Sequence, residues 1–170
     1  TSKIDLYFPN EHSPARKVNS LIHFISRGCM NIDGLGESIV EDFYNMGIIK
    51  DITDIYKLKD KKEELIELEG FGSKSVSNLL ISIENSKNNS LENLLNGLGI
   101  NGIGAKTAKI LAKKYETMDN LMNASSEELE QIKDIGSTLS NNISNYFDNP
   151  KNRILISKLE ELGLNMNYLG

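Results

Sequence analysis

Glycines recur in this chain in a five-residue pattern, apolar–any–Gly–apolar–Gly, whose chemistry suits the binding of an anion. Three copies are complete, at 32–36, 68–72 and 100–104, and a fourth at 132–136 has Asp134 in place of its first glycine. The first glycine can take a positive φ and reverse the chain. The second opens a helix whose first N–H groups have no partner within the helix. Because that glycine has no side chain, a phosphate could approach these groups closely.

The elements that must position these glycines are predicted from the spacing of the copies. The closing glycines are 36, 32 and 32 residues apart, which indicates one supersecondary unit used repeatedly. Apolar residues follow each copy at helical spacing, so the unit reads as helix, tight turn, helix. We expect four helix-hairpin-helix motifs in two tandem pairs, which could face both strands of a duplex. A plain connection between helices also often contains glycine, and repetition alone does not exclude a purely structural array.

Composition predicts an all-α chain of 170 residues, with one large domain or two small ones. Strand signals are nearly absent, and no apolar run is long enough for a membrane helix. Cys29 stands alone, which suits a reducing compartment, and we expect it to be a small buried residue rather than a nucleophile. The net charge of −5 argues against a general binder of polyanions.

The charges are unevenly distributed over the segments that follow the glycine turns. Residues 104–115 carry four lysines and no acid, and 72–83 carry only Lys74, whereas 36–47 carry Glu37, Glu41 and Asp42. A charged run is usually only a solvated helix face. In the functional reading, the following residues bind DNA phosphates: Gly34, Gly36, Gly70, Gly72, Lys74, Gly102, Gly104, Lys106, Lys109 and Gly136.

Local signals predict where the helices begin and end. Ser13-Pro14 opens a helix to about residue 27, two short helices fill 51–67, and a long one ends near residue 86. Ser90 and Ser125 are expected caps, and Asn149-Pro150 opens a last helix with one apolar face of Ile154, Leu155, Leu159 and Leu162. The polar break at 87–89 divides the chain. The expected regions are 1–13, 14–88 and 89–164 (the two pairs), and a linker stub at 165–170.

Several stretches together resemble the helix-hairpin-helix domain of bacterial NAD-dependent DNA ligase, in order and over nearly the whole chain. They are 21–36, 65–72, 98–100, 104–108 and 149–153. The resemblance implies a modular enzyme that seals nicks in replication and repair, with NAD as the AMP donor and magnesium as a cofactor. This chain would be its DNA-gripping part, in a cytoplasmic, nucleoid-associated bacterial protein. Its partners would be nicked duplex DNA and the adjacent domains of the same polypeptide, and no membrane would be a partner.

The same resemblance implies that the catalytic residues lie elsewhere. The family's lysine nucleophile belongs to a domain that this chain does not match, so no catalytic residue is expected here. Residues 1–13 align with the second half of the family's four-cysteine zinc finger, but Phe8 and Ser13 occupy the cysteine positions. A tetrahedral zinc site needs four such ligands, so we expect no metal site and no bound zinc, and read this segment as a degenerate remnant.

Two other functions remain open from the sequence. The acids around the first copy favour a protein-interaction or scaffold module, in which hairpins pack on neighbouring domains and DNA binding is weak. A glycosylase of the helix-hairpin-helix class would use a catalytic Asp after a single hairpin. The repetition of the hairpins and the lack of tryptophan for a base pocket weigh against that enzyme. Binding to nicked and intact duplexes at low salt would separate these functions.

Overall fold

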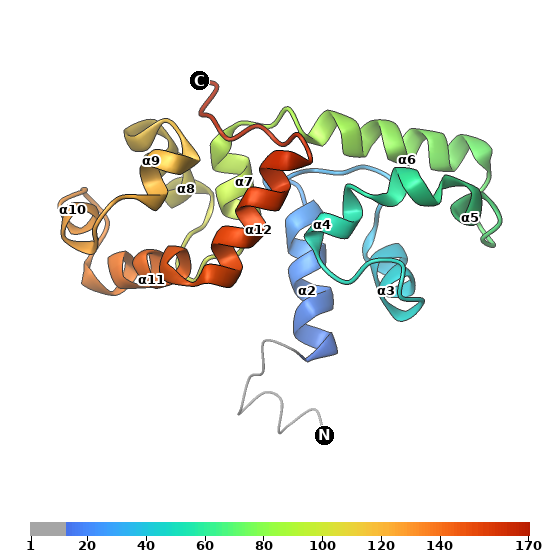
Figure 1. The fold of residues 1–170 in the computed structure, drawn as a ribbon, viewed down its shortest axis with the longest axis horizontal. Coiled ribbons are helices and arrows are strands. Elements are labelled where there is room, and N and C mark those ends of the chain that lie inside the picture. The colour runs from blue at the N-terminus through green and yellow to red at the C-terminus, as the bar shows by residue number, and fades with distance from the viewer. Residues whose placement is uncertain (1–12) are drawn as a thin grey trace.

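The computed structural model describes residues 13–170, and helices dominate this part of the chain, which confirms the all-α prediction (Figure 1). Only one isolated β-bridge, between Thr117 and Asn167, is formed within 13–170. In the same residues, no helix is long and apolar enough to cross a membrane. The zinc-finger prediction concerns residues 1–12 and Ser13, and all of it except Ser13 lies outside the described residues.

The elements follow one another with short connections. The first half contains α2 (Pro14–Ile25), α3 (Glu37–Asn45), α4 (Ile52–Ile55), the 3₁₀ helix η1 (Leu58–Lys61), α5 (Lys62–Ile66) and α6 (Ser73–Ser86). The second half contains α7 (Leu91–Gly97), α8 (Ala105–Tyr115), α9 (Met118–Met122), α10 (Ser126–Glu130), α11 (Ser137–Asp148) and α12 (Pro150–Glu161).

Side-chain caps mark several helix starts as the sequence predicts. Ser13 Oγ accepts a hydrogen bond from the Arg16 N–H at 3.3 Å, and Ser125 Oγ accepts one from the Glu128 N–H at 3.1 Å. Ser90 is the N-cap residue of α7, as predicted, but its Oγ makes no bond to that helix and instead accepts from the Leu169 N–H at 2.8 Å. A distant backbone group therefore uses the hydroxyl that local sequence assigned to the helix.

Helix α2 joins the two halves into one hydrophobic core. It packs on α3 and on α7, and Phe24 meets Tyr56 edge to face with ring centroids 6.2 Å apart. Gly97 allows this approach, because a Cβ there would lie 3.3 Å from Phe24 Cδ1. Asn93 and Asn96 of α7 donate to carbonyls in the 28–29 segment, Asn93 to Cys29 at 2.9 Å and Asn96 to Gly28 at 3.2 Å. The polar break at 87–89 thus separates halves that share a core.

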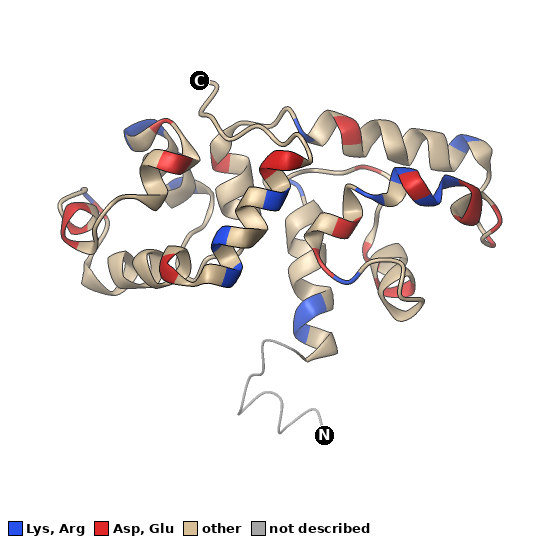
Figure 2. Cartoon of the chain, viewed as in Figure 1, with Lys and Arg blue, Asp and Glu red and all other residues tan. Residues whose placement is uncertain are grey.

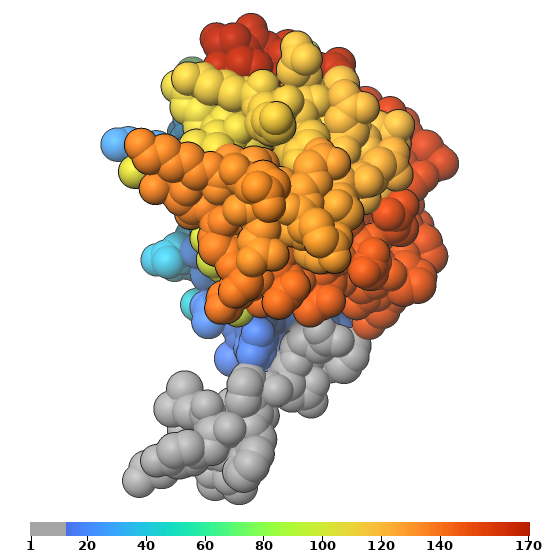
Figure 3. Space-filling model, turned by 90° about the vertical axis from the view of Figure 1, so that its left-hand side faces the viewer, coloured from blue at the N-terminus to red at the C-terminus, as the bar shows by residue number. Residues whose placement is uncertain are grey.

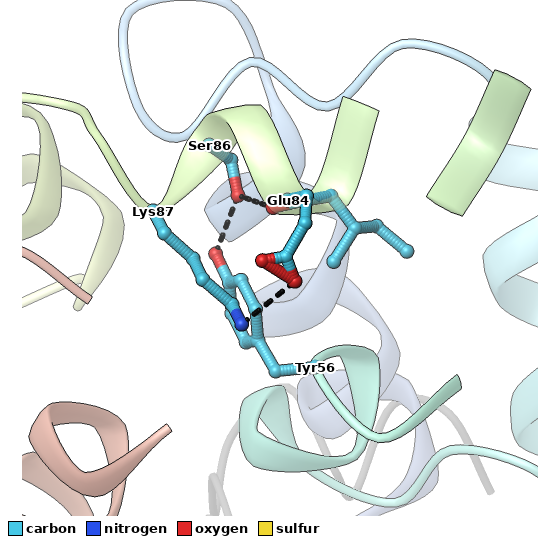
Figure 4. Close-up of polar contacts among 5 residues, drawn as sticks. Tyr56, Glu84, Ser86 and Lys87 are labelled. Carbon is cyan, nitrogen blue, oxygen red and sulfur yellow. Dashed lines mark hydrogen bonds and ion pairs between the residues drawn. The ribbon is translucent and has the colours of Figure 1, made fainter. Parts of the chain in front are cut away.

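A buried hydroxyl pair fastens α4 to the end of α6 (Figure 4). Tyr56 Oη lies 2.9 Å from Ser86 Oγ, which donates to the Ile83 carbonyl at 2.7 Å. Burial, opposed by the Ser86 hydrogen bond and aided by the charge of Glu84, raises the pKa of Tyr56 to about 12. Beside it, Lys87 pairs with Glu84 at 2.8 Å. Satisfied polar groups here help to set where α6 ends.

The C-terminal residues lie against the second half and against the break at 87–89 that precedes it. Asn165 N–H donates to the Lys87 carbonyl and Tyr168 N–H to the Glu116 carbonyl, both at 2.8 Å. The segment expected as a linker stub is therefore hydrogen-bonded to the body, and the end view shows it beside residues near 115 (Figure 3). The predicted apolar face of α12 needs one correction: Ile154 is 55% exposed, and Ile156 is buried in its place. Ile156 and Leu159 together cover the core.

Candidate nucleic-acid interface

All four glycine turns have the same backbone reversal at their third residue. The φ angles are 89° at Gly34, 85° at Gly70, 92° at Gly102 and 74° at Asp134. Aspartate tolerates the left-handed region better than most residues, so the fourth turn keeps the geometry without a glycine. In the second, third and fourth turns the N–H of the fourth residue donates to the carbonyl of the first, at 2.9–3.1 Å.

The closing glycines begin α3, α6, α8 and α11 in the same way. Each has an extended backbone, accepts the first helical hydrogen bond through its carbonyl at 2.9–3.0 Å, and supplies no side-chain cap. A Cβ added at any of the four would meet nothing within 4 Å. These glycines are Gly36, Gly72, Gly104 and Gly136. By contrast, side chains cap α2, α4, α9, α10 and α12.

These four helix starts therefore combine two properties that an anion site requires. The first N–H groups of a helix lack partners within the helix, and their partial positive charge favours an anion. The open space in front of each closing glycine leaves them accessible from outside. All the predicted site glycines are thus placed in turns of one geometry, with the first glycine reversing the chain and the second leaving the helix start open.

The apolar residue at the fourth position of the pattern is expected to fill the turn, and it is buried in three of the four copies. Leu35, Ile103 and Ile135 are at most 7% exposed. Phe71 is only half-buried and lies 5.7 Å from Phe43 of α3, centroid to centroid. The second turn is consequently the least enclosed, and its phenyl ring leans on the first half's neighbouring helix.

The side chains on the first turn of each helix differ in charge. Two residues after the closing glycine stand Ser38, Lys74, Lys106 and Thr138, and all four are exposed. Helix α3 alone of the four has an acid in its first turn, Glu37. The acids of α3 are visible in Figure 2. Lys109, the remaining predicted lysine, is exposed on the second turn of α8.

The first and third turns each pack on a helix that begins at the next turn along the chain. At Gly34 an added Cβ would lie 3.6 Å from the Leu79 Cα of α6. At Gly102 it would lie 2.7 Å from Leu139 Cδ1 of α11. The Asn142 side chain also donates to the Asn101 carbonyl at 3.3 Å. The first turn therefore rests on α6 and the third on α11, and the third contact is the tighter.

Cys29 and His23 form a contact that sequence reasoning did not anticipate. The thiol is buried, as predicted, and its Sγ lies 3.7 Å from His23 Nε2. That nitrogen also lies 2.7 Å from the Asn96 carbonyl, which can only accept, so Nε2 carries the proton and cannot take one from the thiol. Burial raises the pKa of Cys29. The pair therefore lacks the features of an activated nucleophile.

No group of three or more His, Cys, Asp or Glu side chains within 13–170 is arranged to hold a metal ion. What the interface offers is backbone N–H groups at open helix starts, with lysines beside two of them. Such groups can bind the oxygens of a phosphate.

Known proteins match this chain both in its glycine turns and over most of its length. A sequence profile of the helix-hairpin-helix motif matches residues 93–156, which contain the third and fourth turns. The second half of the chain therefore carries the helix-hairpin-helix motif, and nearly the whole chain matches one segment of bacterial DNA ligases. It is 51% identical to the DNA ligase of Listeria innocua over 95% of the chain, 47% to that of Mycoplasma capricolum over 99%, and 47% to that of Bacillus mycoides over 95%. The chain spans about a quarter of the length of these ligases, 24–25%.

Proposed function

We propose that this chain binds the sugar–phosphate backbone of duplex DNA, without regard to sequence, as the DNA-gripping segment of a DNA ligase. The proposal rests on the starts of four helices, which lack a side-chain cap and have open space where a side chain on the closing glycine would stand. The four glycines are Gly36, Gly72, Gly104 and Gly136. Contacts of this kind hold phosphates and position a protein on a duplex, but they read no bases.

The third turn contributes most to binding in this proposal. Its helix has no acid in the first turn, Lys106 stands beside the open N–H groups, and Lys109 follows on α8. The second turn, with Lys74, comes next. The first two turns share the backbone geometry of the third, and we infer that they form a further helix-hairpin-helix pair outside the matched profile.

The longer protein, in this proposal, is an NAD-dependent ligase that seals nicks in replication and repair. The similarity to DNA ligases supports the ligase part, and the NAD dependence rests on the family resemblance of the sequence. The AMP transfer belongs to segments outside this chain. Incubated with NAD and magnesium, the chain itself should therefore gain no AMP in intact-mass measurements, and metal analysis should find no stoichiometric zinc.

Fluorescence anisotropy with labelled duplexes tests DNA binding directly. We expect dissociation constants of about 10⁻⁴ to 10⁻⁶ M at physiological salt, similar for unrelated sequences and rising steeply with salt. Gly104→Val should weaken binding strongly, because the valine side chain would fill the open space at the start of α8. The fold should tolerate the change, because the backbone at residue 104 is extended and suits valine. Gly36→Val is the matched control at an equivalent position and should cost less. Binding that does not respond to salt, or that selects one sequence, would refute the proposal.

A protein-contact function is the second candidate for the first turn only. A cleft of about 300 Å³ beside α3 is lined by Ile39, Asp42, Phe43, Met46, Leu68, Glu69 and Phe71. Met46 is 56% exposed, and acids border the apolar lining. Such a surface repels phosphates and suits a basic polypeptide. The protein-contact function would be favoured over DNA contact at this turn if Gly36→Val left duplex affinity unchanged.

A further inference from the structure

A groove of about 510 Å³ separates one face of α2 from the third turn. Among the described residues, its α2 wall consists of Arg16, Asn19, Ser20 and His23, and its other wall is the segment 97–103. The four α2 residues follow the spacing i, i+3, i+4, i+7, so they line a single helix face. All four are exposed, whereas the opposite face of the helix is buried in the core.

The two walls are held at a fixed separation. His23 Nε2 donates to the Asn96 carbonyl at 2.7 Å, and Asn96 in turn donates to the Gly28 carbonyl at 3.2 Å. Gly99, with φ of 69°, lies in the left-handed region that favours glycine, and a Cβ there would be in ordinary contact with His23 Cδ2 at 3.8 Å. Neither wall needs to order on binding, so a ligand entering the groove meets a preformed site.

The chemistry of the described lining suits an anionic, hydrogen-bonding chain. None of these residues is acidic, Arg16 is cationic, and Asn19 and Ser20 can donate hydrogen bonds. The groove also runs along the third turn, which ends at Gly104 and the open start of α8. One continuous strand could therefore occupy both places.

We propose that this groove is a second phosphodiester site, continuous with the one at α8. A DNA strand whose phosphate sits on the α8 N–H groups passes between α2 and the third turn, and Arg16 pairs with another phosphate of that strand. Asn19 and Ser20 donate to its backbone oxygens. This inference rests on the proposed DNA binding and adds α2 to the surface, although α2 follows none of the glycine turns.

The test compares two neighbouring cations on α2. Arg16 lines the groove, and Lys17, one residue on, does not line it. Salt titrations of a labelled duplex give the number of phosphates neutralised, since each contact contributes about 0.9 to the slope of log affinity against log salt. We expect Arg16→Ala to lower the slope by about one and the low-salt affinity about fivefold. Lys17→Ala should change both much less, and Arg16→Lys should retain most of the slope.

Asn19→Asp provides a second variant that leaves Arg16 in place. A carboxylate in the groove should weaken binding at least as much as Arg16→Ala, with helical circular dichroism unchanged because the position is exposed. Equal effects of Arg16→Ala and Lys17→Ala would show a general charge effect and overturn the site. Loss of binding in Gly104→Val alone, with both groove variants neutral, overturns the groove but leaves the proposed function standing. A wild-type chain that binds no duplex refutes both.

Discussion

The first and third turns share one backbone and differ in nearly everything around it. Gly34 and Gly102 both have φ near 90°, and Gly36 and Gly104 both leave a helix start uncapped and open. Helix α3 then begins with Glu37, whereas α8 begins with Ala105 and Lys106. The backbone makes both turns able to hold an anion, and the next two side chains decide how favourable that is.

Their packing differs as well as their charge. An added Cβ at the first turn would only touch α6, whereas at the third turn it would enter the space of Leu139 on α11. The third turn also forms one wall of the groove beside α2. Repetition of a motif therefore does not imply equal function. In the proposed function, tertiary neighbours and first-turn charges set the contribution of each copy to DNA binding.

The largest expected effect concerns stability. Gly102→Ala should lower the free energy of unfolding by about 2–3 kcal/mol, and Gly34→Ala by about 1–2 kcal/mol. Both force a side chain into the left-handed region, which costs roughly 1–2 kcal/mol. At Gly102, Leu139 must also leave its rotamer, for about 0.5–1.5 kcal/mol more. Urea unfolding followed by circular dichroism measures both values. Equal costs at the two glycines would show that the third turn is no more tightly packed than the first.

The next effect concerns the charge beside α8. Lys106→Glu should lower duplex affinity about tenfold at low salt, equivalent to about 1.4 kcal/mol, because an attraction is replaced by a repulsion. Stability should hardly change, since the side chain is exposed. Anisotropy titration is the measurement, with Lys158→Glu on α12 as a control of equal charge change. If the control weakens binding as much, net charge rather than the third turn governs affinity.

The reverse substitution at the first turn should give a smaller gain. Glu37→Lys should strengthen duplex binding about two- to fivefold, since it replaces an acid at the start of α3 with a cation. The same cation opposes the helix dipole and should cost about 0.3–1 kcal/mol of stability. Measuring affinity and unfolding on one preparation separates the two effects. Unchanged affinity would mean that the first turn does not contact DNA, in agreement with the protein-contact candidate.

Local sequence predicted the helices and turns well because the signals are local. The glycine pattern, the Ser13-Pro14 start and the Asp134 turn depend on backbone preferences within a few residues. Three features depended on distant partners instead. Ser90 binds Leu169, Ile156 replaces Ile154 in the core, and His23 meets Asn96 across the two halves. The groove beside α2 depends on such contacts between the halves, because the packing of α2 on α7 places a polar helix face beside the third turn.

The smallest expected effect lies in the fourth turn, where Asp134 combines a left-handed backbone with a negative charge beside a candidate phosphate site. Asp134→Asn removes the charge and keeps a residue that tolerates this conformation. We expect duplex affinity to rise up to about twofold, as for a single exposed charge, and stability to stay within about 0.5 kcal/mol.

Asp134→Gly separates charge from conformation at the same position. Glycine relieves the left-handed strain but increases the freedom of the unfolded chain, and these two contributions to stability oppose each other. Both variants should therefore gain the same affinity, because both remove the same carboxylate. If only the glycine variant binds more tightly, the Asp134 side chain obstructs the approach to α11 by its bulk, and its charge is irrelevant. If neither gains, the fourth turn stays off the DNA, and the third turn carries the contact of the second pair alone.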